Sequence, residues 1–142
     1  MVAAPEAFVF MAFPREIPVK DYIQALPEMM LFFANTKCVP RVSTETGTLS
    51  ILCFSDILSF YKEELAGETT NQISMVAARN KTSKLDALNA LAETTMDIVE
   101  NTIEILNESP EACEIFMKFV IGLVHFHTSV GRYRLAELAL HV

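Results

Sequence analysis

The sequence predicts an all-α fold: a single-domain helical bundle of five to seven helices around a buried hydrophobic central helix. Apolar residues recur at helical spacing for about six turns after Ser83, ending at Leu106. A second run, Ala112 to His127, is apolar on nearly every side, which is typical of a helix surrounded by other helices. The chain of 142 residues, 51% of them apolar, is long enough to bury one core.

The first half of the chain divides into an arm and the start of the bundle. Five of the six prolines lie in the first 40 residues, so we expect residues 1–19 to form an extended, apolar N-terminal arm. Residues 20–142 form the single bundle domain. In residues 20–36 the apolar spacing is helical, and Pro27 is expected to kink or restart that helix. Residues 38–47 are a connecting loop.

The second half carries clear signals for helix ends. One helix is expected to begin at the Ser55-Asp56 cap and to end at Gly67, and a short helix follows at 71–79. Ser83 is the predicted N-cap of the long helix that ends near Leu106. Ser109-Pro110-Glu111 starts the central helix, and an amphipathic segment follows from Thr128.

The charge and composition exclude several classes of partner. The net charge of −7 disfavours binding to nucleic acid and to anionic membrane surfaces. We expect no membrane span, because no apolar run reaches the required length of about 18 residues. Three cysteines without a CxxC motif suit reduced thiols, and the N-terminal run lacks a basic region, so we expect an intracellular, cytoplasmic protein.

One face of the long helix carries a stripe of acidic residues. Two interpretations stay open: a solvated helix face, or a surface that docks a basic partner. The stripe consists of Asp86, Glu93, Asp97, Glu100, Glu104 and Glu108.

Candidate catalytic groups are few. His125 and His127 point to different faces of a helix and therefore cannot hold one metal ion. Cys113 lies in the first turn of its helix, but Glu111 and Glu114 oppose a thiolate there. The sequence therefore predicts no catalytic residue, no metal, no cofactor and no enzymatic activity.

A binding function is the remaining expectation. Seven methionines and ten phenylalanines favour a hydrophobic groove that binds an amphipathic partner helix. The alternative is a structural protein that assembles with itself through its apolar arm and surface. The groove candidates are Ile57, Phe60, Tyr61, Leu65, Leu88, Leu91, Met96, Val99, Ile103, Ile115, Phe116 and Phe119.

The stretch from Glu104 to Phe126 resembles the B-cell lymphoma two family of apoptosis regulators. The similarity lies in the Glu104-Ile105-Leu106 start and in the core Phe119-Val120-Ile121-Gly122. Glu111-Ala112-Cys113-Glu114 stand where the family has Asn-Trp-Gly-Arg, so its partner-binding arginine is not carried over. A second register places that signature at Ser129-Val130-Gly131-Arg132. The resemblance implies a viral inhibitor of apoptosis that sequesters proapoptotic helices.

We also expect a homodimer. The apolar excess should leave a patch on the surface, and an odd number of cysteines leaves one thiol without an internal partner. Cys38, in the predicted loop, is the candidate for an intersubunit disulfide under oxidising conditions.

Overall fold

A computed structural model describes residues 5–36 and 54–138, and in this part of the chain every regular element is a helix, without a strand. The α-helices are α1 (Pro5–Ala12), α2 (Leu26–Thr36), α3 (Phe54–Leu65), α4 (Gln72–Asn80), α5 (Lys84–Ile105) and α6 (Pro110–Ser129). Short 3-10 turns are η1 (Val19–Asp21), η2 (Ile23–Ala25), η3 (Leu106–Glu108), η4 (Gly131–Tyr133) and η5 (Leu135–Leu138). The predicted all-α, single-domain fold is confirmed.

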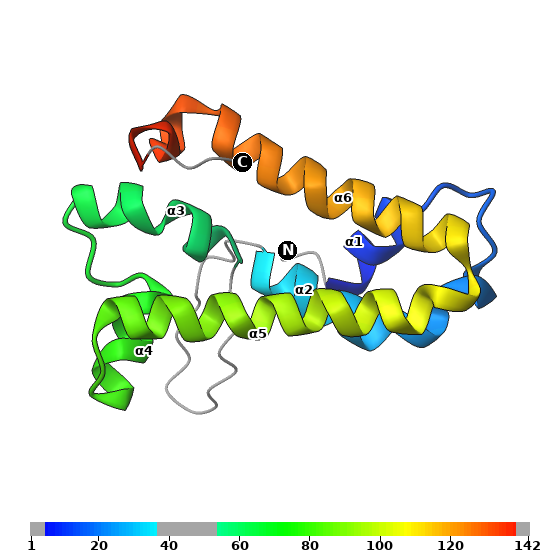
Figure 1. Ribbon diagram of the computed structural model, residues 1–142, viewed down its shortest axis with the longest axis horizontal. Helices are drawn as coiled ribbons and strands as arrows, with labels where there is room; N and C mark the ends of the chain where they lie inside the picture. Colours follow the sequence, from blue (N-terminus) through cyan, green and yellow to red (C-terminus); the bar gives the residue numbers. More distant parts are fainter. Residues whose placement is uncertain (1–4, 37–53, 139–142) are drawn as a thin grey trace.

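The two long helices, α5 and α6, set the frame of the molecule (Figure 1). They run along its length and meet at η3, while α3 lies near the far end of α6, where the chain continues into η4. Helix α2 packs on α5 and α1, and α4 packs on the first half of α5. This arrangement brings α3 and η4 into contact although they are far apart in the sequence.

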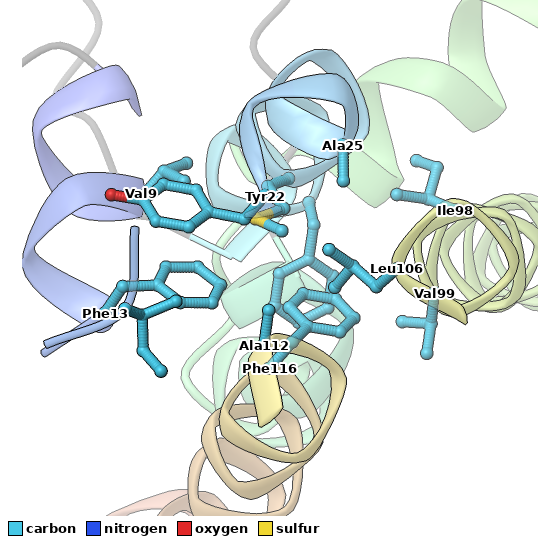
Figure 2. Close-up of a cluster of buried hydrophobic side chains, with 12 residues drawn as sticks. Val9, Phe13, Tyr22, Ala25, Ile98, Val99, Leu106, Ala112 and Phe116 are labelled. Atoms are coloured by element: carbon cyan, nitrogen blue, oxygen red, sulfur yellow. The ribbon is translucent and has the colours of Figure 1, made fainter. Parts of the chain in front are cut away.

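The main core cluster lies where α1, α2, α5 and α6 converge (Figure 2). The rings of Phe13 and Tyr22 stack with centroids 4.1 Å apart, and Phe32 meets Phe116 edge to face at 5.5 Å. Such aromatic pairs contribute beyond the area that they bury. The buried members are Val9, Phe13, Ile17, Tyr22, Ala25, Met29, Phe32, Ile98, Val99, Leu106, Ala112 and Phe116.

A second core cluster joins α3, α4 and the first half of α5. Its buried residues lie on α4 and α5, and α3 contributes partly buried ones. The buried members are Ile73, Ala77, Ala87 and Leu91, and Ile57, Phe60, Val76 and Leu88 pack against them.

The helix ends follow the sequence signals closely. Ser83 caps α5 with a complete capping box, in which its hydroxyl accepts from the Asp86 amide at 3.0 Å and its own amide donates to the Asp86 carboxylate. Ser109 and Pro110 open α6 as predicted, although the Ser109 side chain makes no capping hydrogen bond. After α3, Gly67 adopts a left-handed φ of 73°, as expected of a residue that ends a helix.

The N-terminal segment differs from the expected extended arm. Residues Pro5–Ala12 form α1, because proline at the first helical position does not interrupt the hydrogen-bond pattern. The side chains of Val9, Phe13 and Ile17 are then buried in the main core cluster. The segment therefore packs on the body of the molecule.

Helix α6 is less enclosed than its apolar sequence predicts. Ala112, Phe116 and His127 are its buried residues, whereas Ile121 is 61% exposed and Phe126 is 51% exposed. Helical periodicity indicates which faces of α6 are apolar, but it does not indicate whether another helix covers each face. In addition, no helix in the described ranges is both long enough and apolar enough to cross a membrane.

Candidate functional site

The candidate site begins with two polar side chains that are buried on α3. Ser59 and Glu63 lie one helical turn apart and are 3% and 6% exposed. The Ser59 hydroxyl donates a hydrogen bond to Oε1 of Glu63 at 2.5 Å. Oε2 of Glu63 is also buried but has no hydrogen-bond partner in the described part of the chain. A buried carboxylate oxygen without a partner is costly, so this atom points to a function.

The position of Glu63 in the helix increases that cost. It lies in the last turn of α3, where the helix dipole disfavours negative charge. The chain turns immediately afterwards, since the Glu68 amide donates back to the Glu63 carbonyl at 2.9 Å. Lys62 supplies partial compensation, with Nζ at 3.8 Å from Oε1 of Glu63. The local electrostatics therefore favour a further cation beside Glu63.

A basic and aromatic corner lies against this end of α3. It consists of the last turn of α6 with η4 and η5, residues 127–138, and both η turns contact α3. The Tyr133 ring lies below Lys62, whose Nζ is 6.0 Å from the ring centroid. This distance is at the outer limit of a cation–π interaction. Phe126, half exposed, places its ring 6.1 Å from that of Tyr133.

Two arginines of the corner have different surroundings. Arg134 donates to both carboxylate oxygens of Glu137, at 2.7 and 3.0 Å, and Tyr61 donates to the same carboxylate at 3.3 Å. Hydrogen bonding from Arg134 lowers the pKa of Glu137, and Glu137 in turn raises the pKa of Arg134. Arg132 is exposed and forms no ion pair with another described residue. Arg132 is thus available to bind an anion, whereas Arg134 is already neutralised.

The predicted groove residues are divided between the two core clusters. Ile57, Phe60, Leu88 and Leu91 belong to the second core cluster. Val99 and Phe116 are buried in the main one, and Ile103, Ile115 and Phe119 pack against it. Of the others, Tyr61 hydrogen-bonds Glu137, and Leu65 and Met96 are about half exposed. Cys38 lies outside the described residues.

Sequence reasoning passed over the pair that carries the site. It selected Ile57, Phe60 and Tyr61 of α3 for their apolar character and left out Ser59 and Glu63. A signal was present, because Asp56, Ser59 and Glu63 stand at positions i, i+3 and i+7 of one helix. Oxygen-bearing side chains at that spacing share a helix face. Only the structure shows that Ser59 and Glu63 are buried.

The histidines and Cys113 do not form a metal site among the described residues. In the described ranges, no three His, Cys, Asp or Glu side chains gather closely enough to hold a metal ion by themselves. The side chain of Asp56 lies outside the described residues. His125 is exposed and His127 is 4% exposed, so the two point away from each other.

Comparison with known proteins identifies the family. A model of the trichodiene synthase family matches residues 28–141. An alpha-cuprenene synthase of Coprinopsis cinerea is 35% identical over 133 residues, which cover 94% of this chain and 35% of the relative. A monoterpene synthase of Postia placenta is 38% identical over 120 residues, 84% of this chain and 30% of the relative.

A third relative is also a synthase by name. A longiborneol synthase of Gibberella zeae is 34% identical over 102 residues, 72% of this chain and 30% of the relative. The chain thus spans about a third of the length of the curated relatives that it matches. No solved structure matches it.

These matches overturn the functional expectations drawn from the sequence. The resemblance to the B-cell lymphoma two family is wrong, because it rested on one apolar helix and its entry, a feature that many helical bundles share. Three expectations that depended on it are therefore also wrong: the viral origin, the apoptosis regulation and the non-enzymatic binding of a partner helix. The expectation that the chain is not an enzyme is also wrong, since the matched family and relatives are synthases. The chain belongs to the trichodiene synthase family.

Proposed function

We propose that this chain carries part of the catalytic site of a terpene synthase, and that the Ser59–Glu63 pair lies within that site. The supporting observation is the buried carboxylate of Glu63, which has one oxygen bonded to Ser59 and the other without a partner. The relatives act as synthases of terpenes, and the family match covers the whole site.

A divalent cation fits this pair. The Glu63 carboxylate and the Ser59 hydroxyl are the hard oxygen ligands that Mg²⁺ prefers. When bound, the ion would neutralise negative charge on a phosphorylated substrate. The chain itself supplies Oε2 of Glu63, which has no other partner among the described residues.

The neighbouring corner suits an acyclic isoprenoid diphosphate as the substrate. Lys62 and Arg132 offer positive charge for the diphosphate, close to the Tyr133 ring. The half-exposed ring of Phe126 next to Tyr133 offers apolar surface for the hydrocarbon. Such an amphiphilic substrate needs both kinds of surface side by side.

The first experiment measures cation binding to the chain by isothermal titration with Mn²⁺. Replacing Glu63→Gln removes the charge but keeps the shape, and we expect the affinity to fall about tenfold or more. Glu68→Gln is the matched control, since Glu68 is exposed and lies just beyond the site. Equal Mn²⁺ affinities of the wild type and Glu63→Gln would refute the site.

A second experiment tests the reaction. The chain is incubated with C10 and C15 isoprenoid diphosphates and Mg²⁺, and products are separated by gas chromatography with mass spectrometric detection. A terpene product that depends on Glu63 would support the proposal. Inorganic pyrophosphate binding, promoted by Mn²⁺, tests the anion side separately.

We also infer an intracellular, cytoplasmic location. The odd cysteine count without a CxxC motif supports it, since such thiols persist in reducing compartments. Cell fractionation with a tagged chain would test this inference.

A further inference from the structure

His127 is the one buried ring on the described part of the corner that the proposed function does not use. It lies in the last turn of α6 and is 4% exposed, whereas His125, two residues earlier, is exposed. Nδ1 of His127 lies 2.8 Å from the carbonyl oxygen of Leu123. Because a carbonyl only accepts, Nδ1 must carry the hydrogen of this bond. The bond fixes the plane of the imidazole ring.

The fixed ring holds Tyr133. The centroids of the His127 and Tyr133 rings are 4.4 Å apart with the planes tilted by 45°. Phe126 meets the His127 ring edge to face at 5.3 Å, and its centroid is 6.1 Å from Tyr133. Tyr133 therefore packs against two rings of α6, one of which is locked to the helix backbone.

Tyr133 in turn lies next to the charged part of the site. Its ring is 6.0 Å from Nζ of Lys62, and the same Nζ is 3.8 Å from Glu63. A continuous series of contacts thus runs from the backbone of α6 to α3, through His127, Tyr133 and Lys62. The packing of Tyr133 beside Lys62 therefore depends on the position of the His127 ring.

We propose that His127 is a positioning residue: it fixes Tyr133 beside Lys62 and so sets the geometry of the anion-binding side of the site. This inference rests on the proposed function. His127 acts only through Tyr133. It does not touch the substrate, and it leaves the cation-binding pair of Ser59 and Glu63 unchanged.

The test is a double-mutant cycle on His127 and Tyr133, with the affinity for inorganic pyrophosphate in the presence of Mn²⁺ as the measurement. We expect His127→Leu and Tyr133→Leu each to weaken pyrophosphate binding about tenfold, the size of effect typical of one aromatic or cation–π contact. Because both residues act through one contact, the double variant should also lose about tenfold, not a hundredfold. Losses that multiply in the double variant would overturn the inference.

Two further variants separate positioning from a general structural role. His127→Phe keeps a ring against Tyr133 but lacks the hydrogen bond to Leu123, so we expect its pyrophosphate affinity to lie between those of His127→Leu and the wild type. It also keeps the test open if His127→Leu does not fold, and a full tenfold loss of affinity in this variant would show that ring packing is not the operative feature. His125→Leu, at the same helix end, is the control and should bind as the wild type does.

Mn²⁺ binding alone distinguishes the two proposals. We expect the Mn²⁺ affinity of His127→Leu to change less than about twofold, because Ser59 and Glu63 are on another helix. If the wild type binds neither Mn²⁺ nor pyrophosphate, the proposed function is wrong and this inference falls with it. If the wild type binds both and His127→Leu binds pyrophosphate equally well, only the role of His127 is refuted.

Discussion

At the scale of single residues, Glu63 combines two environments within one carboxylate. Oε1 is matched by the Ser59 hydroxyl, while Oε2 is buried without a partner in the described chain. Removing the Ser59 hydroxyl should raise the free-energy cost of burying the Glu63 carboxylate, because hydrogen bonds to charged groups contribute more to stability than neutral ones.

We therefore predict that Ser59→Ala lowers the free energy of unfolding by about 1.5–3 kcal/mol in the absence of metal. Urea denaturation followed by circular dichroism measures it. Thr69→Ala, an exposed hydroxyl deletion in the loop after α3, is the control and should be nearly neutral. A Ser59→Ala protein as stable as the wild type would show that the hydrogen bond is not needed.

Glu137 gives a prediction about pH. Its pKa is lowered by the hydrogen bond from Arg134, so the folded protein holds this carboxylate ionised below the unfolded value of about 4.3. The contact therefore stabilises the fold above that unfolded value and is lost as the pH falls through the lower folded pKa. A carbon-13 NMR titration of the Glu137 carboxyl should show the depressed midpoint.

Two variants decide the cause of that depression. Arg134→Gln should raise the Glu137 midpoint toward the unfolded value, whereas Arg132→Gln should leave it in place. If both arginine changes shifted the midpoint equally, the effect would come from general charge rather than from the hydrogen bond.

At the scale of the helices, two glycines should respond in opposite ways to substitution by alanine. Gly67 has a left-handed φ of 73°, which a side chain resists, whereas Gly122 lies inside α6 with open space where a Cβ would be. We predict that Gly67→Ala destabilises the fold by about 1 kcal/mol and that Gly122→Ala stabilises it by about 0.5–1 kcal/mol. Urea denaturation of both variants checks this, and shifts of the same sign would contradict it.

Helix ends were predictable from sequence, but buried faces were less so. The cap at Ser83 and the helix end at Gly67 depend on residue types within a few positions of each other, so the sequence alone indicates them. The buried face of α5 instead includes Thr95 and Thr102, which look polar in sequence. Their hydroxyls donate to the carbonyls of Leu91 and Ile98, so each can be buried without loss.

The candidate site was the least predictable part. Ser59 and Glu63 are ordinary surface residues by type, and they become buried only because α3 packs among α2, α4, α5 and the distant corner. Tyr133 lies some 70 residues further along the chain, and nothing in local periodicity places it beside Lys62. Contacts of that range require the tertiary fold.

At the scale of the whole molecule, exposed apolar side chains favour association, and a homodimer remains our proposal. Met11 is 77% exposed and Ile121 61%. Burying several hundred Å² of such surface at about 25 cal/mol per Å² offsets much of the cost of association.

Size-exclusion chromatography with light scattering at tens of micromolar should therefore give twice the chain mass. Ile121→Glu should shift the protein toward the monomer, because it places a charge on the apolar face. A wild-type monomer at those concentrations, with its thiols inaccessible to labelling reagents, would exclude the dimer.

Helix α5 also has a consequence for how the fold is lost. Its 22 residues extend about 33 Å, contributing Ala87 and Leu91 to the second core cluster and Ile98 and Val99 to the main one. Because both clusters pack on this one helix, unfolding of either cluster removes contacts that hold α5 in the other. The described body should therefore unfold as one cooperative unit. Calorimetry should then show a single endotherm whose enthalpy equals the van't Hoff value, and two separate peaks would mean that α5 breaks near Thr95.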